Sequence, residues 1–214
     1  MEIVNQKVYF LGDSITAGVG ASVPEKSFVR LFANKYPQAT VINYGISGTR
    51  IAKKTVPSEN PYCDQDFIDR VEQMEDGADL VVIFGGTNDY GHGDAPIGKF
   101  GDTDPYTFYG GARTLFEKLL FKFPKARLLV LTPLHRIKEL NENAQGDVFY
   151  KFIVALRETA ELFSIPVLDL YAVSGINPNF GNLKEEYMTD GLHPNDAGHQ
   201  RVFDLIDAYI KHSL

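Results

Sequence analysis

Hydroxyl, amide and imidazole groups that could act together on a carbonyl carbon occur in four short segments of the chain. These segments are residues 12–18, 43–48, 85–89 and 190–195. In the first segment, Ser14 stands between a short apolar run and a predicted helix, so we expect its hydroxyl at the end of a strand. Its own N–H would face the same space, with the positive end of the helix behind it. A plain turn or a helix cap also explains this segment when it is taken alone.

The last segment pairs a carboxylate with an imidazole. Asp190 lies three residues before His193. At that spacing the carboxylate can bind Nδ1 and fix the tautomer in which Nε2 acts as a base. The alternative interpretation is an Asp or Asn helix cap with an incidental histidine.

The two middle segments supply hydrogen-bond donors. Gly45 follows the second apolar run, and a glycine leaves its backbone N–H open to a ligand oxygen. Asn88 follows two glycines after the third run, and its amide offers two N–H donors. Such donors could stabilise a developing oxyanion, although simple turns are the alternative in both segments.

The remaining histidines and the single cysteine do not indicate a metal site. His92 and His135 fall in long loops, where they could line a pocket, whereas His199 and His212 are expected on the outer face of a helix. No His, Asp or Glu cluster has ligand spacing. Cys63, as the only cysteine, excludes an internal disulfide and a cysteine-based zinc site. We therefore expect neither a metal nor an organic cofactor.

The elements that must position these groups follow from the apolar pattern. Five runs without polar alternation, typical of strands buried on both faces of a parallel sheet, are residues 8–11, 40–44, 80–84, 127–131 and 165–170. Apolar residues at helical spacing occur within residues 28–32, 65–74, 108–120, 149–163 and 202–210. This alternation predicts an α/β fold with right-handed crossovers, and one domain spanning residues 1–214.

Smaller signals refine this prediction. Asp104-Pro105 and Asn195 are predicted helix starts, and the pair Gly110-Gly111 predicts a close approach of backbone to a helix. The motifs fall at the carboxyl ends of predicted strands, where open α/β sheets bind ligands. Three long polar stretches are predicted to be functional loops, namely residues 89–103, 135–147 and 171–189.

Taken together and in this order, the four segments resemble the blocks of the GDSL/SGNH hydrolase family, which is named for its Ser, Gly, Asn and His. Gly12-Asp13-Ser14-Ile15 resembles the nucleophile block, with Ile where many members have Leu. Residues 43–48, 86–89 and 190–194 are similar to the glycine, asparagine and Asp–His blocks. The resemblance implies a flavodoxin-like three-layer α/β/α sandwich around a central, mostly parallel five-stranded sheet. It also implies ester hydrolysis.

The same resemblance implies the roles of individual residues. Ser14 would be the nucleophile, His193 the base and Asp190 the carboxylate that orients the imidazole, with an acyl-enzyme formed on Ser14. The oxyanion hole would consist of the N–H groups of Ser14 and Gly45 and the side-chain amide of Asn88. Residues expected to hold turns around this site are Asp13, Asn43, Ser47 and Asp89.

Composition excludes other functional classes. The 214 residues carry 28 acidic and 21 basic side chains, a net charge of −7, so no basic face for nucleic acid is expected. Apolar runs of at most five residues are far shorter than the roughly 20 that a membrane helix needs. No signal-peptide pattern opens the sequence. We expect a cytoplasmic protein whose partner is a small-molecule ester, with the oligomeric state left open.

The sequence defines the ester substrate less closely than it defines the reaction. Polar loops favour short acyl esters, such as acetyl esters, of a hydrophilic alcohol such as a carbohydrate. A lysophospholipase or thioesterase would instead use an apolar trough, which could be formed by Phe100, Tyr106, Phe180 and Tyr187. A non-catalytic carbohydrate- or nucleotide-binding module on the same fold is the alternative from a different class. Residues 18–20 supply two glycines of a dinucleotide motif but not the third.

Overall fold

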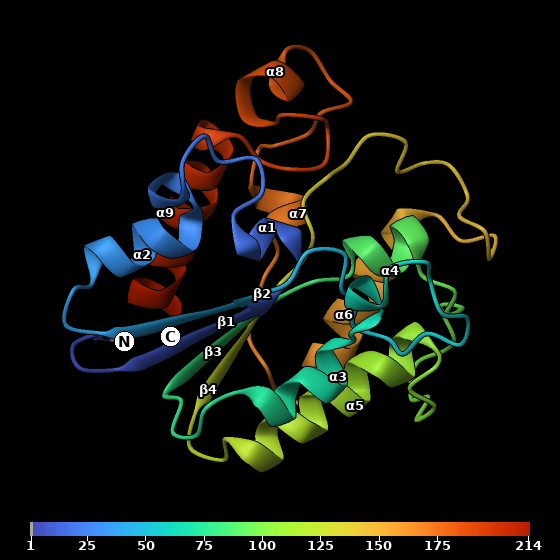
Figure 1. Ribbon diagram of the computed structural model, residues 1–214, viewed down its shortest axis with the longest axis horizontal. Coiled ribbons are helices and arrows are strands. Elements are labelled where there is room, and N and C mark those ends of the chain that lie inside the picture. Colours follow the sequence, from blue (N-terminus) through green and yellow to red (C-terminus); the bar gives the residue numbers. More distant parts are fainter. Residues whose placement is uncertain (1) are drawn as a thin grey trace.

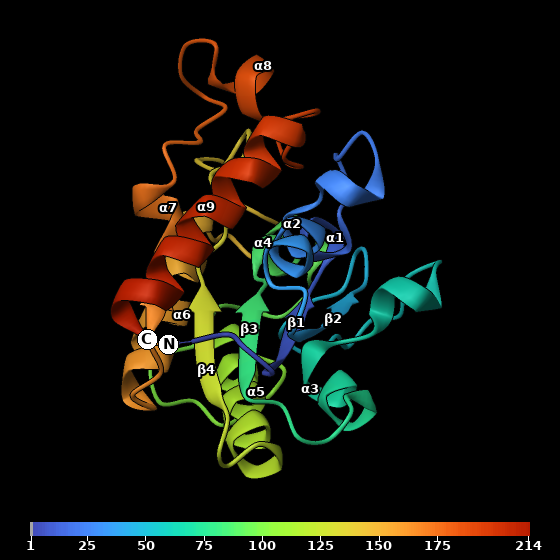
Figure 2. The same cartoon turned by 90° about the vertical axis from the view of Figure 1, so that its left-hand side faces the viewer.

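The computed structural model describes residues 2–214, and the five predicted strands form one parallel sheet in it (Figure 2). The strands are β1 (Lys7–Gly12), β2 (Thr40–Gly45), β3 (Leu80–Phe84), β4 (Arg127–Leu131) and β5 (Val167–Leu168). Their order in the sheet is β2-β1-β3-β4-β5, and every neighbouring pair is parallel. This is the strand order of flavodoxin-like folds. The α/β prediction is confirmed, with a wholly parallel sheet.

The helices cover both faces of this sheet. They are α1 (Ser14–Ala17), α2 (Phe28–Lys35), α3 (Phe67–Arg70), α4 (Thr87–His92), α5 (Phe108–Lys122), α6 (Phe149–Leu162), α7 (Leu170–Val173), α8 (Leu183–Tyr187) and α9 (Asp196–Ser213). Short 3-10 turns occur at Pro24–Lys26, Pro61–Asp64 and Val71–Gln73. Within residues 2–214, no helix combines the length and the hydropathy that crossing a membrane requires.

Two apolar cores separate the three layers. Alternate side chains of β1 point to opposite faces of the sheet, as the pleat dictates. Val8 and Phe10 pack in the core under α2 and α9, whereas Tyr9 and Leu11 pack in the core under α3, α5 and α6. Figure 1 shows these two groups of helices on either side of the sheet.

Three predictions about elements are corrected in detail. β2 is an edge strand with Thr40 and Asn43 exposed, so it lacks burial on both faces. β5 is shorter than predicted because the side chain of Asp169 already caps α7 by accepting from Ala172 N. Helix α5 begins after Thr107, whose side chain accepts from Gly110 N, rather than at Asp104.

The glycine pair in α5 does mark a close approach, as predicted. A Cβ on Gly110 would lie 2.0 Å from the carbonyl oxygen of Asp104, and one on Gly111 would lie 2.7 Å from Cα of Ala52. The Asn195 prediction is also confirmed, since its side chain accepts from Gly198 N at the start of α9.

His199 is not on the surface, as the sequence led us to expect. It is fully buried, and its ring stacks on Phe28 with centroids 6.0 Å apart. Its Nδ1 accepts from the backbone N–H of Phe28 at 3.3 Å, and its Nε2 lies 3.2 Å from the carbonyl oxygen of Val19. This histidine therefore fastens α9 to the start of α2.

Candidate active site

A serine, a histidine and an aspartate from opposite ends of the sequence form one hydrogen-bonded row. The Oγ of Ser14 lies 2.9 Å from Nε2 of His193, and these residues are 179 positions apart in the chain. The Nδ1 of His193 lies 2.7 Å from Oδ2 of Asp190. Ser14 follows β1, and the other two residues precede α9. The structure thus brings the three residues together at the carboxyl end of the sheet.

Ser14 is held at the first position of α1. Asp13 caps this helix, since its Oδ1 accepts from Ile15 N at 3.0 Å. The strand turns directly into the helix at Gly12, where a Cβ would lie 2.0 Å from Oγ1 of Thr16. An N–H in the first turn of a helix has no intrahelical acceptor, and among residues 2–214 that of Ser14 has no other partner. It therefore remains available as a donor.

The loop before α9 fixes the proton positions of the imidazole. Partial burial of Asp190 opposes its ionisation, but hydrogen bonds from the backbone and ring of His193 and from Leu192 N hold the pKa of this carboxyl below its usual range. Its Oδ1 accepts from both backbone N–H groups at 2.8 Å. An ionised carboxylate can only accept, so Nδ1 carries the proton and Nε2 accepts from the hydroxyl of Ser14.

Asn88 lies at the start of α4, after β3. Its Nδ2 donates to the carbonyl oxygen of Thr49 at 3.0 Å. An amide nitrogen has two hydrogens, so one N–H of Asn88 has no acceptor among residues 2–214. The preceding Gly86 has φ 111°, a left-handed conformation that favours glycine and allows the chain to turn from β3 into α4.

Gly45 does not provide the free donor that the sequence predicted. Its N–H donates to Oδ1 of Asn43 at 2.8 Å, and Nδ2 of Asn43 donates to the carbonyl oxygen of Thr16. The Gly45 N–H is therefore already used inside the turn. By contrast, the N–H of Gly48 has no partner within residues 2–214, and Gly48 precedes the Thr49 that binds Asn88.

Arg70 organises the base of the site, and no motif or spacing in the sequence predicted this role. Its guanidinium donates to the carbonyl oxygen of Gly12 at 3.0 Å and to Oγ1 of Thr49 at 2.8 Å. It also donates to the carbonyl oxygen of Tyr44. Burial lowers its pKa to about 10, which still leaves it charged at neutral pH. One cation thus joins the ends of β1 and β2 to the loop that contacts Asn88.

The two aspartates next to Ser14 and Asn88 accept hydrogen bonds from backbone N–H groups, as expected for residues that hold turns. Asp13 caps α1, and Asp89 accepts from Ile51 N and Ala52 N at 3.0 and 2.8 Å. Burial raises the pKa of Asp13 to about 7 and that of Asp89 to about 6. Hydrogen bonds from the backbone oppose this rise in both cases.

Among residues 2–214, no group of three or more His, Cys, Asp or Glu side chains is placed to hold a metal ion. Cys63 is half-buried, and its Sγ accepts from Nδ2 of Asn60 at 3.3 Å.

A hydroxyl–imidazole–carboxylate row at the carboxyl edge of a flavodoxin-like sheet is an arrangement suited to serine hydrolases. A sequence profile of the GDSL-like lipase/acylhydrolase family matches residues 10–201, which include all four motif segments. The chain therefore belongs to this family of ester hydrolases.

One relative and two solved structures are similar to this chain over most of its length. The GDSL lipase Rv0518 of Mycobacterium tuberculosis is 26% identical over 219 residues, covering 97% of this chain and 82% of the relative. A crystal structure of a protein from Lactobacillus plantarum has a TM-score of 0.86 and 27% identity, with full coverage of both chains. A two-domain esterase active on acetylated mannans shares the fold, with a TM-score of 0.65 and 24% identity, over 96% of this chain and 48% of the esterase.

Proposed function

We propose that this protein cleaves carboxylic esters through an acyl-enzyme on Ser14. The observation that carries the proposal is the row from Ser14 Oγ to His193 Nε2 at 2.9 Å and from His193 Nδ1 to Asp190 at 2.7 Å. A serine hydroxyl is a weak nucleophile until an adjacent base accepts its proton. This geometry supports His193 as that base, in the tautomer that the reaction requires.

The reaction follows in two halves. The Oγ of Ser14 attacks the ester carbonyl carbon while its proton moves to Nε2 of His193, and the ionised Asp190 stabilises the resulting imidazolium. Collapse of the tetrahedral intermediate breaks the bond to the alcohol oxygen, which takes the proton from Nε2. Water then gives a proton to Nε2 as its oxygen attacks the acyl carbon. Collapse of this second intermediate breaks the bond to Ser14 Oγ, which takes the proton back from Nε2, and the carboxylic acid is released.

Three N–H groups are proposed to hold the tetrahedral oxyanion. Two are those predicted from the sequence, the backbone N–H of Ser14 and the second N–H of Asn88. For the third, we replace Gly45 with Gly48, because the Gly45 N–H is bonded to Asn43 whereas that of Gly48 has no partner in residues 2–214. Donors preorganised in this way stabilise the negative charge that develops on the oxygen in the transition state.

For the substrate, we propose a short acyl ester, such as an acetyl ester, of a hydrophilic alcohol. The loops that border the site are rich in polar side chains, and the two-domain esterase that shares the fold is active on acetylated mannans. A long-chain lipid or a thioester is the alternative. Comparing p-nitrophenyl esters of increasing chain length with acetylated saccharides separates these substrates.

Substitution of Ser14 tests the reaction. Ser14→Ala should lower kcat for p-nitrophenyl acetate by a factor on the order of 10⁴–10⁶, because the nucleophile is lost. A fluorophosphonate probe should label the wild-type protein but not this variant. Ser213→Ala, at the end of α9 and exposed, is the matched control and should keep both activity and labelling. Wild-type turnover by Ser14→Ala would refute the proposal, and labelling of the wild type would exclude a non-catalytic binding module.

A further inference from the structure

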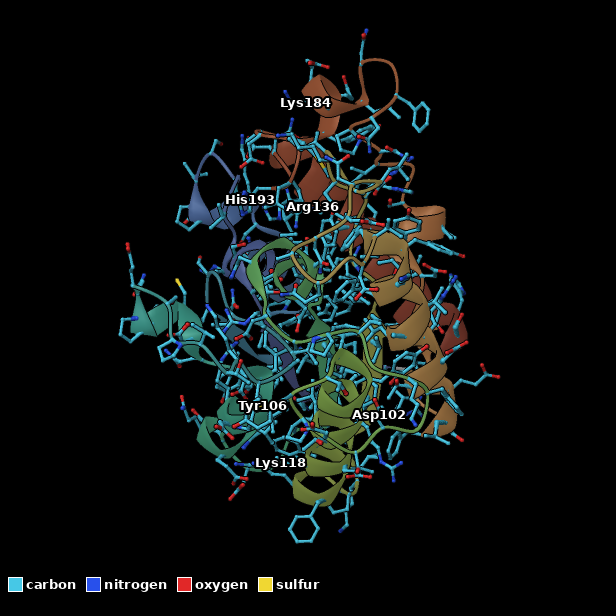
Figure 3. The ribbon with its side chains drawn as sticks, turned by 90° about the vertical axis from the view of Figure 1, so that its right-hand side faces the viewer. Asp102, Tyr106, Lys118, Arg136, Lys184 and His193 are labelled. Atoms are coloured by element: carbon cyan, nitrogen blue, oxygen red, sulfur yellow. The ribbon has the colours of Figure 1, made fainter. Side chains whose placement is uncertain are left out.

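A cavity beside α4 has walls that are hydrogen-bonded to the segments that carry Asn88 and His193. It has a volume of about 320 Å³, and we call it the α4 cavity; its lining comes from residues 90–93, 136–138 and 141–144. Its walls touch the site on two sides. Arg136 donates to the carbonyl oxygen of Thr87, next to Asn88, at 2.8 Å. The N–H of Ile137 donates to the carbonyl oxygen of Gly191, in the loop of Asp190 and His193, at 2.9 Å. Figure 3 shows Arg136 close to His193 at this end of the molecule.

The α4 cavity is lined by hydrogen-bond donors that lack acceptors. The Nε of Arg136 and the Nδ2 of Asn143 are buried and have no hydrogen-bond partner within residues 2–214. Lys138 adds an exposed side chain to the lining, and within the described chain its ammonium makes no ion pair. Buried donors without acceptors cost free energy, so a ligand rich in oxygen atoms would be favoured here.

His92 supplies another donor to the same lining. An arginine can only donate, so the contact of 3.4 Å between Arg50 and Nδ1 of His92 makes Nδ1 an acceptor. Burial, and then the charge of Arg50, lower the pKa of His92, so the ring is neutral and its proton is on Nε2. His92 is four residues after Asn88, on the same face of α4 and about 6 Å further along the axis.

The lining of the α4 cavity has more basic than acidic side chains, in a chain whose net charge is −7. Arg136 and Lys138 line the cavity. Outside the lining, the fully buried Arg50 contacts His92 and lies 3.8 Å from Asp64. Glu142 is the one acidic residue of the lining. An excess of cations and N–H donors in a concave site favours negatively charged ligands.

The walls of the cavity are held in place before any ligand binds. Lys138 has φ 61°, a left-handed conformation that is unusual for a residue with a side chain. Its carbonyl oxygen accepts from the hydroxyl of Tyr90 at 2.8 Å and from Asn141 N at 3.0 Å. These two bonds, one of them from α4, fix the segment opposite the helix.

We propose that the α4 cavity binds a carboxylate or phosphate group of the ester substrate, one helical turn along α4 from Asn88. The inference rests on the proposed function, because the charged group belongs to the ester that Ser14 would attack. It narrows the substrate class to esters with an anionic substituent, such as an acetylated acidic saccharide.

Matched pairs of esters test this preference. On the acyl side, mono-p-nitrophenyl adipate is compared with p-nitrophenyl hexanoate. On the alcohol side, 4-acetoxybenzoate and 4-acetoxyphenyl phosphate are compared with 4-methylphenyl acetate, which separates carboxylate from phosphate. At low salt we expect kcat/KM, corrected for the uncatalysed rate, to be at least about 10-fold higher for one anionic ester than for its neutral partner. Added salt should reduce this ratio.

Two single variants locate the effect. Lys138→Gln and His92→Leu should each reduce the anionic-to-neutral ratio of kcat/KM by about 3- to 10-fold, in line with loss of one charged or donor contact. Lys125→Gln is the control, since this exposed residue lies just before β4, at the opposite end of the sheet, and should leave the ratio unchanged. Thermal unfolding verifies that each variant is folded.

The outcomes separate this inference from the proposed function. A wild-type ratio near one for all pairs, or a ratio that neither variant changes, overturns the anion site while Ser14-dependent turnover stands. Turnover that survives in Ser14→Ala overturns the proposed function instead.

Discussion

At the scale of single residues, the proton positions in the site follow from groups that can only donate or only accept. The ionised Asp190 requires a proton on Nδ1 of His193, and Arg50 requires one on Nε2 of His92. Two histidines near α4 and α9 therefore hold opposite tautomers. One presents an acceptor to Ser14, and the other presents a donor to the α4 cavity.

Asn88 provides a test at the same scale. Asn88→Ala should lower kcat for p-nitrophenyl acetate by about 10²–10³, with a smaller change in KM, because its free N–H is proposed to act mainly on the transition state. Steady-state kinetics measure both constants. Asn182→Ala, in the exposed segment before α8, serves as the control. An unchanged kcat in Asn88→Ala would show that this side chain serves only the bond to Thr49.

The sequence could identify the motif residues but not all of their partners. Ser14, His193 and Asn88 stand out because their residue types and their places after apolar runs suit chemistry. The use of Gly45 depends on the rotamer of Asn43, which turns back to accept its N–H. Arg70 reaches the carbonyl oxygen of Gly12 across 58 positions of the chain. Neither contact produces a sequence pattern from which it could be predicted.

At the scale of elements, the apolar pattern predicted where strands and helices occur better than it predicted their polar contacts. Continuous apolar runs identified all five strands, and spacing of three and four identified α2, α5, α6 and α9. The prediction that His199 lies on the outer face of its helix was wrong, because burial of an imidazole depends on hydrogen-bond partners that the helical spacing does not reveal. Those partners, Phe28 and Val19, lie 171 and 180 residues away.

His199 also gives a prediction for the packing of α9. His199→Leu should lower the free energy of unfolding by about 1–3 kcal/mol, because the buried N–H of Phe28 loses its acceptor. Chemical denaturation measures the change. His212→Leu, near the exposed end of the same helix, should change stability by less than about 0.5 kcal/mol. Equal stability of His199→Leu and wild type would mean that the bond to Phe28 contributes nothing.

At the scale of the whole molecule, the buried carboxyl of Asp13 links stability to pH. Its pKa of about 7 in the folded state is above its ordinary value of 3.8. Between these values the folded state binds more protons than the unfolded state, so this group makes stability fall as pH rises from about 4 to 7. Asp89, with a pKa of about 6, acts in the same direction.

Asp13→Asn isolates this contribution. Asparagine keeps an oxygen to cap α1 but has no charge to bury. The unfolding free energy of the variant relative to wild type should therefore increase between pH 4 and pH 8, by on the order of 2–4 kcal/mol. Urea denaturation across this range measures it. Asp204→Asn, exposed on α9, should show a flat difference, and a flat difference for Asp13→Asn would contradict the raised pKa.

The distance of 179 positions between Ser14 and His193 has a consequence for synthesis of the protein. During synthesis Ser14 leaves the ribosome 179 residues before His193. The strands β1 to β5 also emerge before the loop that carries Asp190 and His193, so a nascent chain can form the sheet while this loop is still inside the ribosome. If His193 is the base that we propose, a chain that has not yet reached this loop would be inert toward esters.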